Sequence, residues 1–173
     1  MLFRSLPKVS RIAILSNVRA EADQKGISRI VEAGKKMGVR LQVVRGVTPQ
    51  EIARAFDAMK REQAGAVIAV ADASIVRERK LVADLALKHR LPSFFANREN
   101  VVAGGLLSYG ENIIESFTRA AQYVSKIMKG AKPGDLPIEQ PTKFDLVINR
   151  KTAKAIGVAL PKELLLRAEE VLD

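Results

Sequence analysis

The chain has 173 residues, 47% of them hydrophobic, and 29 Lys and Arg against 19 Asp and Glu give a net charge of +10. A chain of this length folds as one compact domain, or as one domain with an appendage, and buries enough apolar surface without disulfides or metals. The absence of cysteine excludes a disulfide framework and thiolate chemistry, and the single histidine, His89, excludes a metal site built from several histidines.

Four short apolar runs, each followed by a helical pattern or a turn, make up the first half of the chain. The runs are typical of strands buried on both faces of a parallel sheet, and they cover residues 11–17, 41–47, 66–72 and 91–97. The helical patterns between them cover about 21–37, 48–64 and 75–89. Thr48, Pro49 and Glu51 predict a capping box at the start of the second helix. This order predicts an α/β fold, a three-layer open parallel sheet of flavodoxin-like type with helices on both faces.

The stretch AGGLLSYG, residues 103–110, separates this pattern from a tail of different construction. It predicts a short strand between glycines, followed by a long amphipathic helix over 112–129. The tail then predicts an irregular proline-rich connection (131–142), a half-exposed strand (143–150), a short helix (151–157) and a last amphipathic helix (161–173). We therefore divide the chain into a lead-in linker (1–10), an α/β lobe (11–102), a crossing strand with the long helix (103–130) and a C-terminal return segment that completes the lobe (131–173).

Polar side chains gather where the predicted parallel strands end, and ligands of open parallel sheets bind at these ends. The candidate ligand-binding residues are Asn17, Arg19, Asp72, Ser74, Asn97 and Arg98. Asp72 suits an ammonium group, and Arg19 or Arg98 suits a carboxylate, so the set fits a small polar solute. The alternative for single residues is structural, because Asp72 and Ser74 can cap a helix and Asn17 can turn the chain.

Sequence signatures of catalysis are missing. The chain contains no GxGxxG, GxxxxGK[ST] or GxSxG motif, and His89 falls at the end of a helix, where we expect a surface or capping residue. A receiver-like domain with Asp72 as phosphate acceptor shares the architecture, but the first strand ends in Ser16 and Asn17 without the acidic pair of a Mg²⁺ site. We therefore expect no catalytic residue, no metal site and no cofactor.

The positive charge is spread along the predicted helices and never forms a run of five residues. Aromatic residues make up 5%, and no alternation of aromatic and basic residues indicates an RNA-binding sheet. The charge therefore favours a solvated exterior over a nucleic-acid or anionic-surface partner. No segment reaches the roughly 20 apolar residues of a membrane span, and the first 17 residues do not resemble a signal peptide. The chain as given is expected to be cytoplasmic.

Four segments together carry a likeness to a known family: KVSRIAILSN, SYG before the long helix, KIMKGAKPGDLPIEQP and FDLVINRKTAKAIG. They resemble the substrate-binding proteins of a family of bacterial ABC transporters. The resemblance covers essentially the whole chain, but only about the second half of such a protein. The group is the tryptophan/tyrosine-type uptake family, whose members are periplasmic and have the type-I periplasmic-binding-protein fold with two lobes that close over the solute.

The resemblance implies a non-enzymatic, solute-binding second lobe that partners ABC permease subunits through the complete protein. It also places the crossing between lobes near residues 103–110, and it implies that the helix over 112–129 packs on the first lobe. In this chain Val18 follows Asn17 and Ala73 follows Asp72, where the family often has proline, so the identity of the solute does not carry over.

If the chain is expressed alone, the apolar face of the helix over 112–129 predicts self-association. Three alternatives remain open at this point: a receiver-like or regulatory flavodoxin-fold domain, a basic nucleic-acid-binding protein, and an inactive truncated product.

Overall fold

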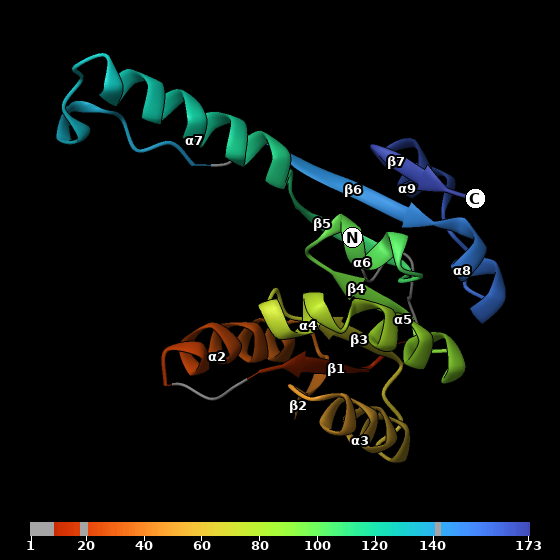
Figure 1. The fold of residues 1–173 in the computed structure, drawn as a ribbon. Helices are drawn as coiled ribbons and strands as arrows, with labels where there is room; N and C mark the ends of the chain where they lie inside the picture. Colours follow the sequence, from red (N-terminus) through yellow and green to blue (C-terminus); the bar gives the residue numbers. More distant parts are fainter. Residues whose placement is uncertain (1–8, 18–20, 141–142) are drawn as a thin grey trace.

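A computed structural model describes residues 9–17, 21–140 and 143–173. Within these residues one sheet contains seven strands in the order β2-β1-β3-β4-β5-β6-β7 (Figure 1). The strands are β1 (Arg11–Ser16), β2 (Arg40–Arg45), β3 (Ala66–Ala69), β4 (Ser93–Phe95), β5 (Leu107–Glu111), β6 (Phe144–Asn149) and β7 (Glu170–Leu172). Strands β1 to β5 are parallel, β6 is antiparallel to β5, and β7 is parallel to β6. The predicted parallel sheet is confirmed, and two tail strands extend it.

Helices cover both faces of this sheet. The helices of the described residues are α2 (Glu21–Lys36), α3 (Pro49–Arg61), α4 (Ala73–Arg77), α5 (Arg79–Lys88), α6 (Arg98–Val102), α7 (Ile113–Met128), α8 (Arg150–Ile156) and α9 (Lys162–Leu166), with a 3₁₀ turn at Pro133–Asp135, and all but α7 lie against the sheet (Figure 1). One buried cluster joins α3, α4 and α5 to the sheet, and a second joins α8 and α9 to it. In β1 the neighbours Ile12 and Ala13 belong to different clusters, because successive side chains of a strand point to opposite faces. This is the predicted three-layer arrangement.

Helix α3 shows how closely a local pattern can determine an element. The Thr48 hydroxyl accepts a hydrogen bond from the Glu51 backbone N–H (3.2 Å), and the Glu51 carboxylate accepts one from the Thr48 N–H (3.1 Å). The predicted capping box is therefore confirmed. The apolar stripe of the helix, which includes Ile52, Phe56 and Met59, is fully buried in the first cluster.

The helix predicted over 75–89 is two helices, because the chain turns at Glu78 between α4 and α5. Helix α4 is held at the end of β3 by its cap, whereas α5 lies along the sheet and buries Val82 and Ala86. One straight helix cannot meet both conditions. His89 is the C-cap of α5, as predicted.

Three features of the tail and of the loop after β4 differ from the predictions. The last predicted helix, 161–173, is α9 followed by β7, because residues 170–172 pair with the edge of β6. The β6 strand is more buried than its pattern indicates: Leu146, Val147 and Ile148 are all in the core, between β5, β7 and the covering helices. The short helix α6 was not predicted, and of the predicted lead-in linker residues 1–8 lie outside the described residues.

The predicted strand in AGGLLSYG is β5, and two glycines of this stretch, one before the strand and one in it, permit close packing. A Cβ atom on Gly110 would lie 2.0 Å from the carbonyl oxygen of Ala96, and one on Gly105 would lie 2.7 Å from that of Asn100. No larger residue fits at these positions without movement of the backbone. Helix α7 follows β5 and projects from the body together with the segment that returns to β6 (Figure 1).

Candidate functional site

The carboxyl ends of β1, β3 and β4 lie along one edge of the sheet, because these strands are parallel and adjacent through β3. Asn17 follows β1, Asp72 follows β3, and Asn97 and Arg98 follow β4. Arg19, the remaining predicted residue after β1, lies outside the described residues. The topology therefore brings the predicted loops to a common edge, as the rule for open parallel sheets requires.

Three of the predicted residues form one hydrogen-bonded cluster, Asn17, Asp72 and Ser74. The Asp72 carboxylate accepts a hydrogen bond from the Ser74 backbone N–H (2.8 Å) and another from the Ser74 hydroxyl. The Asn17 amide nitrogen donates to both oxygens of Asp72, at 3.4 and 3.5 Å. Asp72 is the N-cap of α4, so its predicted capping role is confirmed. The same contacts connect the end of β1 to the end of β3.

The electrostatics of this cluster favour a cationic group. The hydrogen bond from the Ser74 side chain, together with those from the Ser74 N–H and the Asn17 amide, holds the pKa of Asp72 below its ordinary value, although burial opposes the shift. The carboxylate is therefore charged at neutral pH. Beside it, the Asn17 amide oxygen is buried and has no partner among the described residues. A carboxylate and an unpaired amide oxygen together would accept hydrogen bonds from an ammonium group.

The two predicted residues after β4 have other surroundings. Asn97 is the N-cap of α6, but its side chain makes no capping hydrogen bond. The Arg98 guanidinium donates two hydrogen bonds to the Glu170 carboxylate, through Nε and Nη2, each 2.6 Å long. This pairing raises the pKa of Arg98 and lowers the pKa of Glu170. Arg98 could therefore bind a solute carboxylate only in competition with Glu170.

A cavity of about 380 Å³ adjoins the Arg98–Glu170 pair, between the end of β5 and the beginnings of β6 and β7. Its charged wall includes Lys143, Asp145 and Glu169. Asp145 accepts a hydrogen bond from the Asn112 amide (2.9 Å), and Lys143 lies 3.4 Å from the Glu169 carboxylate. The cavity therefore places charged groups of both signs beside the strand-end loops.

Reasoning from the sequence missed these residues of the tail. Lys143 and Asp145 reach the strand-end edge because β6 runs antiparallel to β5, and Glu170 reaches it because β7 begins there. The charged residues at the start of the predicted strand 143–150 were a usable signal, but its direction in the sheet was not known. Among the described residues no group of three or more His, Cys, Asp or Glu could hold a metal ion. Their helices also include none long and apolar enough to cross a bilayer.

The sequence matches the family described as ABC transporter substrate binding protein over residues 1–172. A conserved domain protein of Vibrio cholerae has the same fold, with a TM-score of 0.86 and 24% identity over 98% of this chain and 57% of its own. An ABC domain of Streptococcus pneumonia, solved in complex with L-Trp, has a TM-score of 0.86 and 22% identity over 99% of this chain and 58% of its own.

A third similar structure is CD0873, a substrate binding protein with adhesive properties from Clostridium difficile, solved ligand-free and open. It has a TM-score of 0.74 and 19% identity, over 99% of this chain and 57% of its own. The chain thus spans less than two thirds of the length of these three proteins. No curated protein is significantly similar to the sequence. The family match over almost the whole chain confirms the resemblance found in the sequence, and the chain belongs to the ABC transporter substrate binding protein family.

Proposed function

We propose that the chain is the second lobe of the solute-binding component of an ABC importer and that it binds a small amino-acid-like solute without chemical change. Family membership supports the binding role, and the L-Trp in the Streptococcus pneumonia structure supports an amino acid as the class of solute. The observation that carries the proposal is the Asn17–Asp72–Ser74 cluster at the carboxyl ends of β1 and β3. Its charged carboxylate, and an amide oxygen that has no partner among the described residues, are suited to the ammonium of an amino acid.

The division of the chain fits this proposal. Residues 11–102 form the recognition lobe, residues 103–130 leave it for the first lobe, and residues 131–173 return to complete the sheet. In the complete protein, the lobes would close over the solute and present it to the permease subunits at the outer side of the membrane. Helix α7, which buries none of its residues among the described part of the chain, is then a surface for protein contact. The chain expressed alone would associate with further copies through it.

Isothermal titration calorimetry with a panel of L-amino acids, beginning with L-tryptophan, tests the binding role. We expect saturable binding to the wild-type chain and at least tenfold weaker binding to Asp72→Asn, because a hydrogen bond to a charged group contributes about 1.5–3 kcal/mol. Asp84→Asn is the matched control, since Asp84 is exposed on α5 and pairs with Lys80. Absence of binding for every amino acid, or equal losses in the two variants, would contradict the proposal.

A further inference from the structure

The Arg98–Glu170 ion pair lies at the end of the sheet where the proposed solute site is. Arg98 follows the last residue of β4, Phe95, by three positions, and Asp72 follows the last residue of β3, Ala69, by the same number. The two strands are parallel neighbours, about 4.8 Å apart, so the loops that carry these charges begin side by side. A carboxylate and a guanidinium thus come from adjacent loops of one edge.

Two opposite charges in adjacent loops suit a zwitterion. An α-amino acid carries its ammonium and its carboxylate on one carbon atom, so a site that binds both needs an anion and a cation close together. Asp72 is charged and can accept hydrogen bonds from the ammonium. The Arg98 guanidinium can bind a carboxylate through two parallel hydrogen bonds. In the structure, however, it already holds the carboxylate of Glu170.

The Glu170 carboxylate occupies the place that a solute carboxylate would take. It accepts hydrogen bonds of 2.6 Å from both Nε and Nη2 of Arg98, the geometry with which arginine binds a carboxylate group of any origin. The pair is open to water, since the side chain of Arg98 is 52% exposed and that of Glu170 is 33% exposed. Ion pairs of this exposure contribute little stability, so a competing carboxylate can displace one partner.

The position of Glu170 allows its side chain to leave. Glu170 begins β7, a strand of three residues at the edge of the sheet that pairs, among the described strands, with β6 alone. Rotation of the side chain leaves the backbone pairing of β7 intact. The cavity of about 380 Å³ that adjoins the pair also has Lys143 in its wall. A displaced Glu170 carboxylate therefore still has a cation beside the same cavity.

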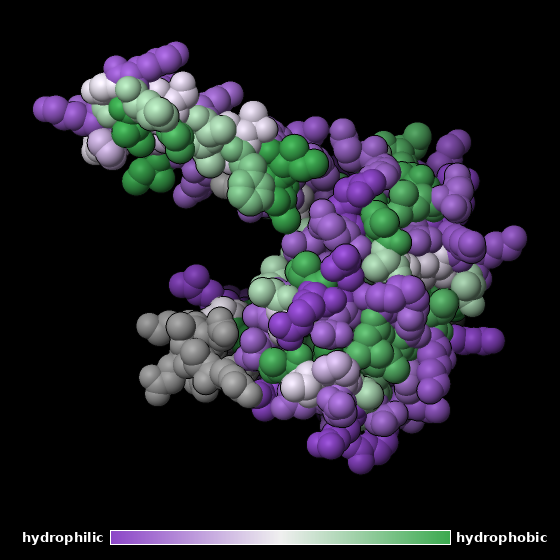
Figure 2. All heavy atoms as spheres, viewed as in Figure 1, coloured by the Kyte–Doolittle hydropathy of each residue, from purple (hydrophilic) through white to green (hydrophobic). Residues whose placement is uncertain are grey.

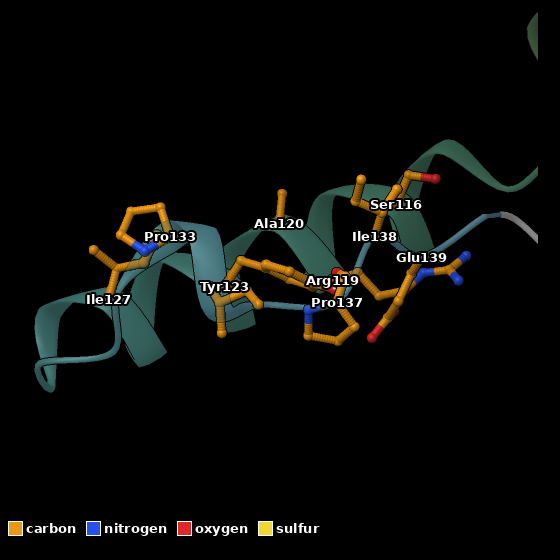
Figure 3. Close-up of a pocket in the computed structure, with 10 residues that line it drawn as sticks. Ser116, Arg119, Ala120, Tyr123, Ile127, Pro133, Pro137, Ile138 and Glu139 are labelled. Carbon is orange, nitrogen blue, oxygen red and sulfur yellow. Dashed lines mark hydrogen bonds between the residues drawn. The ribbon is translucent and has the colours of Figure 1, made fainter.

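Two hollows of the described surface differ in their relation to the pair. Figure 2 shows the protein hollowed beneath the projecting helix α7, on the side where the parallel strands end. A separate cavity of about 460 Å³ lies between α7 and the segment after the 3₁₀ turn, and its charged residues are Arg119 and Glu139 (Figure 3). Of the described residues predicted to bind solute, none lines this cavity. The pair therefore belongs to the strand-end side, where the solute is proposed to bind.

We infer that Glu170 is an internal competitor for the carboxylate of the solute: it pairs with Arg98 until an amino acid that also contacts Asp72 takes its place. The inference rests on the proposed function and names zwitterionic amino acids as the class of solute. A solute with a carboxylate alone must displace Glu170 for a single contact, whereas an amino acid gains the ammonium contact as well. When the amino acid leaves, Glu170 returns to Arg98, so the same competition favours release. Glu170 is thus a positioning residue that acts through Arg98.

Calorimetry with matched pairs of solutes tests the exchange. Each pair is an amino acid and the amine that lacks its carboxylate: L-tryptophan with tryptamine, L-tyrosine with tyramine, and L-leucine with isoamylamine. Arg98→Gln should weaken binding of the amino acid about tenfold and should not weaken binding of the amine, because only the amino acid offers a carboxylate. Glu170→Gln should strengthen binding of the amino acid by up to about fivefold, since it removes the competing ion pair, and should not strengthen binding of the amine.

A double variant separates exchange from a general effect of charge. In Arg98→Gln the additional change Glu170→Gln should no longer strengthen amino-acid binding, because the competitor acts only through the guanidinium. Glu169→Gln is the matched control, since Glu169 lines the same cavity but pairs with Lys143, and it should leave amino-acid binding unchanged.

The outcomes distinguish this inference from the proposed function. Equal strengthening by Glu169→Gln and Glu170→Gln, or an unchanged amino-acid affinity in Glu170→Gln, would overturn the inference. Amino-acid binding that depends on Asp72 but not on Arg98 would overturn it and leave the proposed function intact. Absence of binding for every amino acid would overturn both.

Discussion

Helices α3 and α7 are both amphipathic, begin with a side-chain cap and follow a strand of the same sheet, yet their surroundings are opposite. Helix α3 buries Phe56 completely, whereas α7 leaves Phe117 exposed to 72%. The apolar face of α3 is buried against other elements of its own chain, whereas α7 buries none of its residues in the described part. An amphipathic pattern therefore predicts that a helix needs a partner, but it does not say whether the chain itself supplies that partner.

The two helices should differ most in how much stability the protein loses when a phenylalanine ring is removed. Phe56→Ala should lower the free energy of unfolding by about 3–5 kcal/mol, because it leaves a cavity in the first core cluster. Phe117→Ala should change it little when the chain is dilute enough to be monomeric. Urea unfolding at low protein concentration measures both values. Equal losses in the two variants would show that α7 is part of the cooperative core.

Helix α7 and the segment that follows it, up to residue 140, form an arm that projects from the rest of the described chain, which we call the body (Figure 1). Two glycines allow the junction of body and arm to be compared with the arm itself. Gly110→Ala should lower the free energy of unfolding by about 1–3 kcal/mol, because the new Cβ atom would lie 2.0 Å from the Ala96 carbonyl oxygen and overlap it. Gly134→Ala, in the arm, has no atom within 4 Å of the new methyl group and should be nearly neutral. Thermal unfolding of both variants gives the comparison. A neutral Gly110→Ala would mean that the loop after β4 can move away from β5.

Substitution by glycine within the helices tests whether the arm unfolds separately. Ala58→Gly in α3 should reduce global stability by about 1 kcal/mol, since glycine is a poor helix former. Gln122→Gly in α7 should leave the global stability unchanged but speed hydrogen exchange throughout α7, because a helix of 16 residues that buries none of them is marginal in water. If Gln122→Gly lowers the global stability as much as Ala58→Gly does, the arm and the body unfold as one unit.

The sequence predicted the body better than the tail for a physical reason. The strands and helices of residues 11–97 carry patterns that depend on burial in their own lobe, so the parallel sheet, the capping box at Thr48 and the apolar stripe of α3 were predicted correctly. Residues 161–173 were predicted as one helix, because their leucine-rich pattern does not show that β6 offers an open edge for Val171. That edge exists only after β6 has joined the sheet.

The candidate site likewise contains residues that the sequence could predict and residues that it could not. Asp72 and Asn17 could be proposed because parallel strands bring their ends together, and the structure connects the two residues through hydrogen bonds. Glu170, which pairs with Arg98, could not be proposed, because this contact joins residues far apart in the sequence through the position of β7. The sequence thus indicates which loops are available, whereas the tail determines which of their side chains remain unpaired.

The smallest expected effect is the difference in stability between the loss of an ion pair in the body and the loss of one in the arm. In the body the Arg98–Glu170 pair is bidentate, whereas in the arm Glu115 lies 3.8 Å from Arg119. Both pairs are partly exposed, so Glu170→Gln should lower the free energy of unfolding by at most about 1 kcal/mol at pH 7, and Glu115→Gln should lower it by less.

The stabilisation by the Arg98–Glu170 pair should depend on pH, and the direction of this dependence follows from the pKa of Glu170. Arg98 lowers the pKa of Glu170 below its ordinary value of 4.5. The folded state therefore binds the proton more weakly than the unfolded state, and the contribution of the pair is fully present above pH 4.5 and is lost as the pH falls through the lower folded value. Urea unfolding of the wild-type chain and Glu170→Gln should accordingly differ at pH 7 and converge in acid. A difference that persists at the lowest pH would show that Glu170 acts through packing around β7 rather than through its charge, and the Arg98 guanidinium would then be more readily available to a solute carboxylate than the pairing indicates.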